Sequence, residues 1–127
     1  MTKSKSSFID LVSLETDENS FTISVDEQLL FLSVSHVTIV LPLEDFPELV
    51  ELLQKSRKKF DDSGILGVET SNCAYRVEIC DEDDGAVHIH VLTFGLNLMI
   101  TLSIDQTSKF ITVCEIALIK LKEKGLV

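Results

Sequence analysis

Apolar and polar residues alternate along two stretches of the chain, and a stretch with helical spacing separates them. The first alternating stretch breaks into four short segments at polar residues, and these segments span residues 8–14, 21–25, 30–35 and 36–41. Alternation with a period of two places the apolar side chains of a strand on one face. The pattern therefore predicts four short antiparallel strands with tight connections.

The period changes after Pro42. Apolar residues then recur at mixed spacings typical of a helical stripe, and they are Phe46, Leu49, Val50, Leu53 and Phe60. Glu44 and Asp45 suit the first turn of a helix, and the basic run at 55–59 suits its C-terminal end. The segment 61–64 predicts the end of this helix and a link between two halves of the chain.

The second half repeats this plan. A weak strand at 66–69 is followed by alternation at 75–80, 87–92 and 96–102. A long helix is predicted to start at Ser103 or Asp105 and to run to about Lys122. This second helix carries more apolar residues than one stripe needs, so we interpret it as a core helix, with a homodimer face as the alternative.

The two strand-to-helix junctions can be superimposed. Residues 39–45 and 100–106 follow the same pattern, which is an apolar residue, any residue, Leu, any residue, an apolar residue, an acidic residue and a polar residue. We therefore predict an α+β fold built from a duplicated β-β-β-β-α unit, in a single domain 1–127 with pseudo-repeats at about 8–60 and 66–124. Each unit alone would leave apolar surface in water, and pairing two units would bury it.

This order of elements resembles the Whirly and Pur-alpha families and the single-stranded-DNA-binding transcriptional coactivators, including a small cyanobacterial branch of the fold. The resemblance covers nearly the whole chain, and the junction at 39–46 is similar to that of the coactivators, with an acid and an aromatic residue at the helix start. It implies that single-stranded nucleic acid binds on the outer sheet face, where rings stack on bases and cations contact phosphates.

Carried onto this sequence, the resemblance implies a specific set of residues. Phe31 and Phe94 are the candidates for stacking on bases, and Arg76, His88 and His90 alternate onto the same outer face. Arg76 is the one permanent cation in this set.

The net charge of the chain favours a different kind of partner. The 127 residues include 11 Lys and Arg against 21 Asp and Glu, a formal net charge of −10. Such a domain repels a polyanion unless it has a local basic patch. The basic residues cluster at 55–59 and 120–124, at the C-terminal ends of the two predicted helices. The helix dipole favours cations at these ends, so a ligand is not needed to account for the clusters. The alternative function is therefore an acidic protein–protein adaptor, similar in size and charge to secretion chaperones or immunity proteins, with a basic protein partner.

A zinc site is a further interpretation of the second half. His88 and His90 share one strand face, and a hairpin with a loop of odd length would place Cys80 opposite one of them and Glu78 opposite or diagonal to the other. We prefer a solvated sheet face and expect no metal, because no second Cys/His cluster completes a tetrahedral set. The acidic run 81–85 is typical of a hairpin turn and lacks the spacing of a calcium loop.

No nucleophile with a base and no phosphate-binding loop is evident, so we expect a non-enzymatic protein without a cofactor. Three cysteines without metal spacing suit a reducing cytoplasm, and no apolar run approaches the length that crosses a membrane. Hydrophobic residues make up 45% of the chain, enough for a folded core. We expect a cytoplasmic monomer or homodimer.

Overall fold

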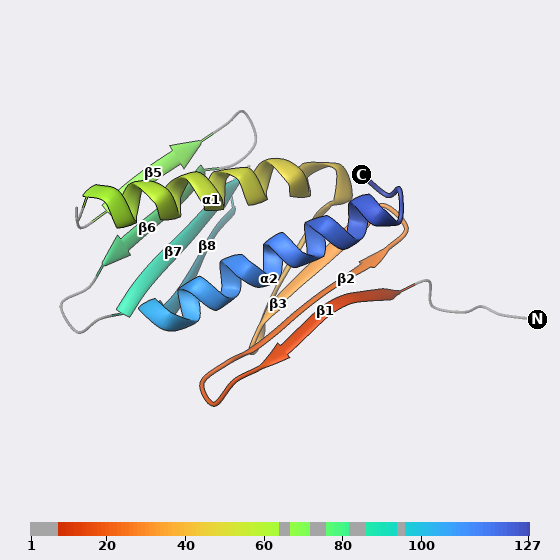
Figure 1. Cartoon of the computed structure of the whole chain (residues 1–127), viewed down its shortest axis with the longest axis horizontal. Helices are drawn as coiled ribbons and strands as arrows, with labels where there is room; N and C mark the ends of the chain where they lie inside the picture. The colour runs from red at the N-terminus through yellow and green to blue at the C-terminus, as the bar shows by residue number, and fades with distance from the viewer. Residues whose placement is uncertain (1–7, 64–66, 72–75, 82–85, 94–95) are drawn as a thin grey trace, which may run out of the picture. The chain divides into compact units, whose positions relative to one another are not determined.

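The computed structural model describes residues 8–63, 67–71, 76–81, 86–93 and 96–127, with side chains at 8–58, 100–103 and 105–127. These residues form antiparallel sheets and two long helices (Figure 1), so the predicted α+β class is confirmed. The first half consists of β1 (Ile9–Glu15), β2 (Ser20–Asp26), β3 (Leu29–Val34), β4 (Val37–Pro42), the short 3-10 turn η1 (Leu43–Asp45) and α1 (Phe46–Ser63). The second half consists of β5 (Gly67–Ser71), β6 (Arg76–Asp81), β7 (Ala86–Thr93), β8 (Leu96–Ser103) and α2 (Ile104–Glu123).

The chain divides into two compact units. One unit runs up to Pro47 and also contains Thr112–Val127, and the other comprises Glu48–Ile111. The first unit holds a sheet in the order β1-β2-β3-β4, and the second holds a sheet in the order β5-β6-β7-β8. No helix in the described part of the chain combines the length and the apolar character that crossing a membrane requires.

The core of the first unit is built on one face of its sheet. Alternate residues of β2 and β3 are almost completely buried and lie opposite one another in the register, and they are Phe21, Ile23, Val25, Leu30, Leu32 and Val34. Leu41 of β4, which pairs with Leu30, extends this row. Because a slip of one residue would move the whole apolar set into water, this pattern fixes the register of the sheet.

A bulge in β1 ties the sheet to α2. Asp10 pairs with Ser24 and Val12 pairs with Ile23, which leaves Leu11 as the extra residue. A bulged residue lacks a regular ladder partner, and here the Lys120 ammonium donates a 2.7 Å hydrogen bond to the Leu11 carbonyl oxygen. This bond joins the C-terminal part of α2 to β1 within the first unit.

Two hairpin turns of the first sheet hold non-glycine residues in the left-handed region. Ser35 has a φ of 54°, and its neighbours support it: its N–H donates to the Ser20 carbonyl at 2.7 Å and its hydroxyl donates to Asn19 Oδ1 at 3.0 Å. Glu27 has a φ of 57° and an exposed side chain. A residue with a Cβ is disfavoured in this conformation, so Glu27 stores backbone strain.

In the second unit, α2 begins where the sequence predicts. Ser103 Oγ accepts a hydrogen bond from the Gln106 N–H at 3.2 Å, and the Thr107 hydroxyl donates to the Ser103 carbonyl at 2.9 Å. The Ser-x-x-Gln spacing is that of a capping box. One turn on, Lys109 Nζ lies 2.9 Å from Asp105 Oδ2, and this hydrogen bond lowers the pKa of the Asp105 carboxyl.

We predict that Glu27→Gly stabilises the protein by about 0.5–1 kcal/mol, because glycine adopts a positive φ without steric strain. Equilibrium unfolding in urea measures the change. Glu27→Gln is the matched control, since it removes the charge and keeps the Cβ, and it should leave the stability nearly unchanged. Equal stabilisation by both variants would assign the effect to charge and contradict the backbone explanation.

We also predict that Lys120→Met lowers the free energy of unfolding by about 1–2 kcal/mol, because it removes a charged donor from the Leu11 carbonyl while keeping the side-chain length. Lys122→Met, at an exposed position of the same helix, is the control and should have little effect. If the two variants unfold at the same urea concentration, the bond to the bulge does not stabilise the fold.

Candidate binding face of the first sheet

The first sheet has a second face, opposite the core, which we call the outer face. Two rows of residues cross it in register, namely Asp10, Ser24, Phe31 and Val40 in one row and Ser13, Thr22, Ser33 and Thr38 in the other. The first row ends at β4 in Val40, which is 51% exposed. Exposed apolar positions beside uncharged hydroxyls make this face a candidate surface for a partner.

An aromatic pair lies at one side of the outer face. The ring centroids of Phe8 and Phe31 are 4.9 Å apart and the rings are tilted by 48°, a geometry that favours aromatic packing. Phe8 is 50% exposed, and Phe31 is half-buried. The structure therefore places Phe31 on the outer face and adds Phe8, which sequence reasoning did not select because no local pattern indicates a ring pair.

The second row of the outer face, from Ser13 to Thr38, contributes uncharged hydroxyl groups that can form hydrogen bonds. The hydroxyl oxygens of Ser33 and Thr38 lie 2.9 Å apart across β3 and β4. A hydroxyl can both donate and accept, so this row can meet either a donor or an acceptor on a bound chain.

The electrostatic character of this sheet is one-sided. Between residues 8 and 47 the sequence contains neither Lys nor Arg, and every formally charged side chain is a carboxylate: Asp10, Glu15, Asp17, Glu18, Asp26, Glu27, Glu44 and Asp45. A surface surrounded by charges of one sign attracts the opposite sign and repels its own. Cationic groups are therefore favoured here, and phosphates are disfavoured.

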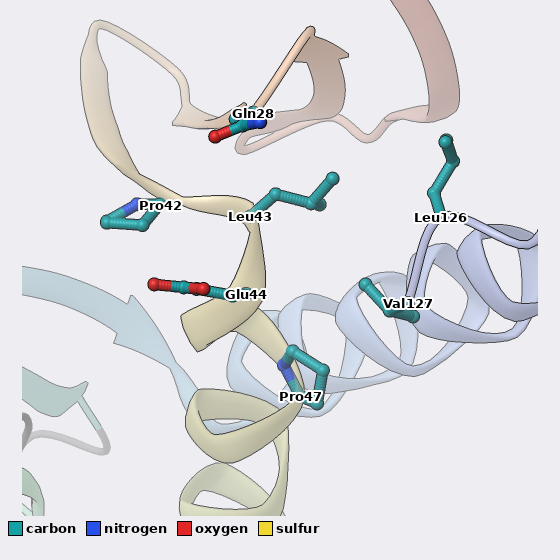
Figure 2. Close-up of a pocket in the computed structure, with 7 residues that line it drawn as sticks. All are labelled: Gln28, Pro42, Leu43, Glu44, Pro47, Leu126 and Val127. Carbon is teal, nitrogen blue, oxygen red and sulfur yellow. The ribbon is translucent and has the colours of Figure 1, made fainter.

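A hollow of about 520 Å³ lies at the end of β4 in the same unit (Figure 2), and it is lined by Gln28, Pro42, Leu43, Glu44, Pro47, Leu126 and Val127. Pro42 is the register partner of Leu29, which is 45% exposed, so the hollow continues the exposed apolar positions of the sheet. The walls are about equally polar and apolar, and Glu44 supplies a carboxylate. Such a site suits an aliphatic chain that ends in a cation.

Arg76, His88 and His90 lie in the second unit, where the structure describes their backbone. Arg76 is paired opposite Leu92, His88 opposite Cys80, and His90 opposite Glu78. His88 and His90 are therefore neighbours on β7, whereas Phe31 belongs to the first unit. Phe94 lies outside the described residues.

Cys114 of α2 is a core residue. It is fully buried, and this burial raises the pKa of its thiol, which keeps the sulfur protonated and unreactive. Among the side chains that the structure describes, no group of three or more His, Cys, Asp and Glu residues is arranged to hold a metal ion.

No family model matches the sequence, and no curated protein matches it. Among solved structures, the chain is similar to one titled as the crystal structures of Trypanosoma bruciei MRP1/MRP2. The TM-score is 0.40 at 10% sequence identity, over 95% of this chain and 88% of that chain. A similarity at this level supports no statement about function.

Proposed function

We propose that the protein is a non-enzymatic binding module, and that the outer face of its first sheet, with the adjoining hollow, binds a basic and partly apolar segment of another protein. One observation carries this proposal: the sheet exposes apolar positions, and the stretch 8–47 that forms it contains carboxylates and neither Lys nor Arg, so that Lys120 of α2 is a cation from outside this stretch that contacts the sheet.

Each part of the surface has a role in such a complex. Phe8, Phe31 and Val40 offer apolar area, and aromatic side chains often dominate binding energy at protein interfaces. The surrounding carboxylates speed the encounter with a basic partner and select against acidic ones. A Lys or Arg side chain of the partner can lay its aliphatic stem in the hollow and its charged end beside Glu44.

An extended partner segment fits this surface best. β4 is an edge strand of the first sheet, and its Val37 and Val40 are exposed. Edge strands bind extended peptides through main-chain hydrogen bonds, while alternate side chains give specificity. A segment added beside β4 would place every second side chain next to Thr38 and Val40 on the outer face.

A second candidate function is the binding of single-stranded nucleic acid, in a duplicated β-β-β-β-α fold of the Whirly type. The observation that favours it is the exposed ring pair of Phe8 and Phe31, because bases stack on such rings. Arg76, His88 and His90 would add the cations. The carboxylates of the stretch 8–47, with Asp10 in the same row as Phe31, oppose this candidate, since phosphate neutralisation supplies most non-specific affinity for nucleic acids.

Fluorescence anisotropy with three labelled probes distinguishes the candidates. The probes are a peptide of alternating lysine and valine, its glutamate and valine counterpart, and a random single-stranded DNA of about 30 nucleotides, all at about 50 mM salt. We expect the lysine peptide alone to bind saturably, and more weakly as salt rises. Saturable binding of the DNA that is lost in Phe31→Ala would instead support the second candidate.

Matched variants show whether the peptide binds the proposed surface. Val40→Lys should weaken its binding at least about tenfold, because it places a like charge on the outer face of the edge strand that the peptide would join. Ile119→Lys is the control: it adds the same charge at a 57% exposed residue of α2 and should have a much smaller effect. Equal losses in both variants, or no binding of any probe, would overturn the proposal.

A further inference from the structure

The register of the second sheet brings four metal-binding residue types together on two neighbouring strands. Cys80 of β6 lies directly opposite His88 of β7, and Glu78 lies directly opposite His90. Residues two apart on a strand share one face, so all four positions lie on the same face of the sheet. Directly opposite residues have Cβ atoms about 4.5–5.5 Å apart, a spacing that one metal ion can bridge.

The exposure of residues on β8 distinguishes the two faces of this sheet. His88 is paired with Thr101 of β8, and Thr101 is exposed. The residues on either side of it, Ile100 and Leu102, are buried and belong to the opposite face. The four positions therefore share a face with an exposed residue, and burial of apolar surface gives no reason for a cysteine and two histidines there.

The neighbouring strand supplies an independent indication of a cation. Glu69 of β5 lies directly opposite Glu78. Two like charges in this position destabilise a sheet, and a bound cation at Glu78 would relieve the repulsion.

The sequence alone favoured a solvated face without a metal, but the register pairs both histidines with a further metal-binding residue type, and we propose that Cys80, His88, His90 and Glu78 bind one Zn²⁺ ion. Thiolate, imidazole and carboxylate are the ligands that zinc takes in proteins, and four of them complete a tetrahedral shell. The ion would join β6 to β7 through side chains, and Glu69 would add negative charge beside the site. This site lies on the second sheet and is independent of the binding function proposed for the first.

Cobalt substitution in the full-length protein tests the site. The protein is stripped with a chelator, kept reduced with a phosphine and titrated with Co²⁺, and then the cobalt is displaced with Zn²⁺. We expect one Co²⁺ per chain, with the absorption of a tetrahedral cobalt centre and a charge-transfer band from a cobalt–thiolate bond, both lost when Zn²⁺ is added. Absence of stoichiometric binding would overturn the proposal.

Variants assign the ligands. Cys80→Ser should abolish the cobalt–thiolate band. His88→Ala and His90→Ala should each weaken zinc binding at least about 100-fold. Loss of a residue that only hydrogen-bonds to a ligand costs about 10–100-fold, so a larger loss indicates a direct ligand. Cys73→Ser and His36→Ala, which change the same residue types elsewhere in the chain, are the controls and should leave binding intact. A thiolate band that persists in Cys80→Ser, or equal losses in the controls, would contradict the site.

Glu78→Gln gives a test that does not depend on the folding of damaged variants. It should raise the thermal midpoint of the metal-free protein, because it removes the like-charge pair with Glu69, and it should lower the zinc affinity. If Glu78 had only a structural role, its substitution would not raise the thermal midpoint while it lowers the zinc affinity. Unchanged zinc affinity in Glu78→Gln would remove this residue from the ligand set and refute the four-ligand site.

Discussion

One-sided burial of the first sheet is the constraint on which the rest of the first unit depends. Phe21, Ile23 and Val25 lie in register against Val34, Leu32 and Leu30, and burial of each such side chain stabilises the fold by about 1.5–3 kcal/mol. Exposing this whole set by a slip of one residue would cost on the order of the entire net stability of a small domain. Because the side-chain period is two, the same register turns Phe31, Ser33 and Val40 outward. The outer face is thus a direct consequence of the core, and its chemistry is available to a partner.

Charge then decides which partners such a face accepts. Carboxylates surround the first sheet, and Glu69 and Glu78 lie opposite each other in the second. Both arrangements favour cations: a basic peptide on the first sheet and a metal ion on the second. The formal charge of −10 is therefore more than a general aid to solubility, because it sets the sign of the ligands that both proposed sites would take.

The sequence predicted local features well, because periodicity and capping are local. Strand alternation, the capping of α2 by Ser103 and the placing of Cys80 opposite one of the two histidines all follow from short-range patterns. The bond from Lys120 to Leu11 joins residues far apart in the chain, so no local pattern could predict it. The hollow was missed for the same reason, since Leu126 and Val127 line it together with residues near Pro42. Alternation placed Phe31 in the outer row of the sheet, but no local pattern pointed to its ring partner Phe8.

Cysteine scanning along β3 tests the central claim that the sheet has one buried face and one open face. In full-length protein with Cys73→Ser and Cys80→Ser, single substitutions Leu30→Cys, Phe31→Cys, Leu32→Cys and Ser33→Cys are treated with a thiol reagent, and buried Cys114 serves as the protected reference. The account predicts that thiols at 31 and 33 react at least about tenfold faster than those at 30 and 32, since exposure and thiolate formation control the rate. Uniform rates, or protection at 31 and 33, would contradict it.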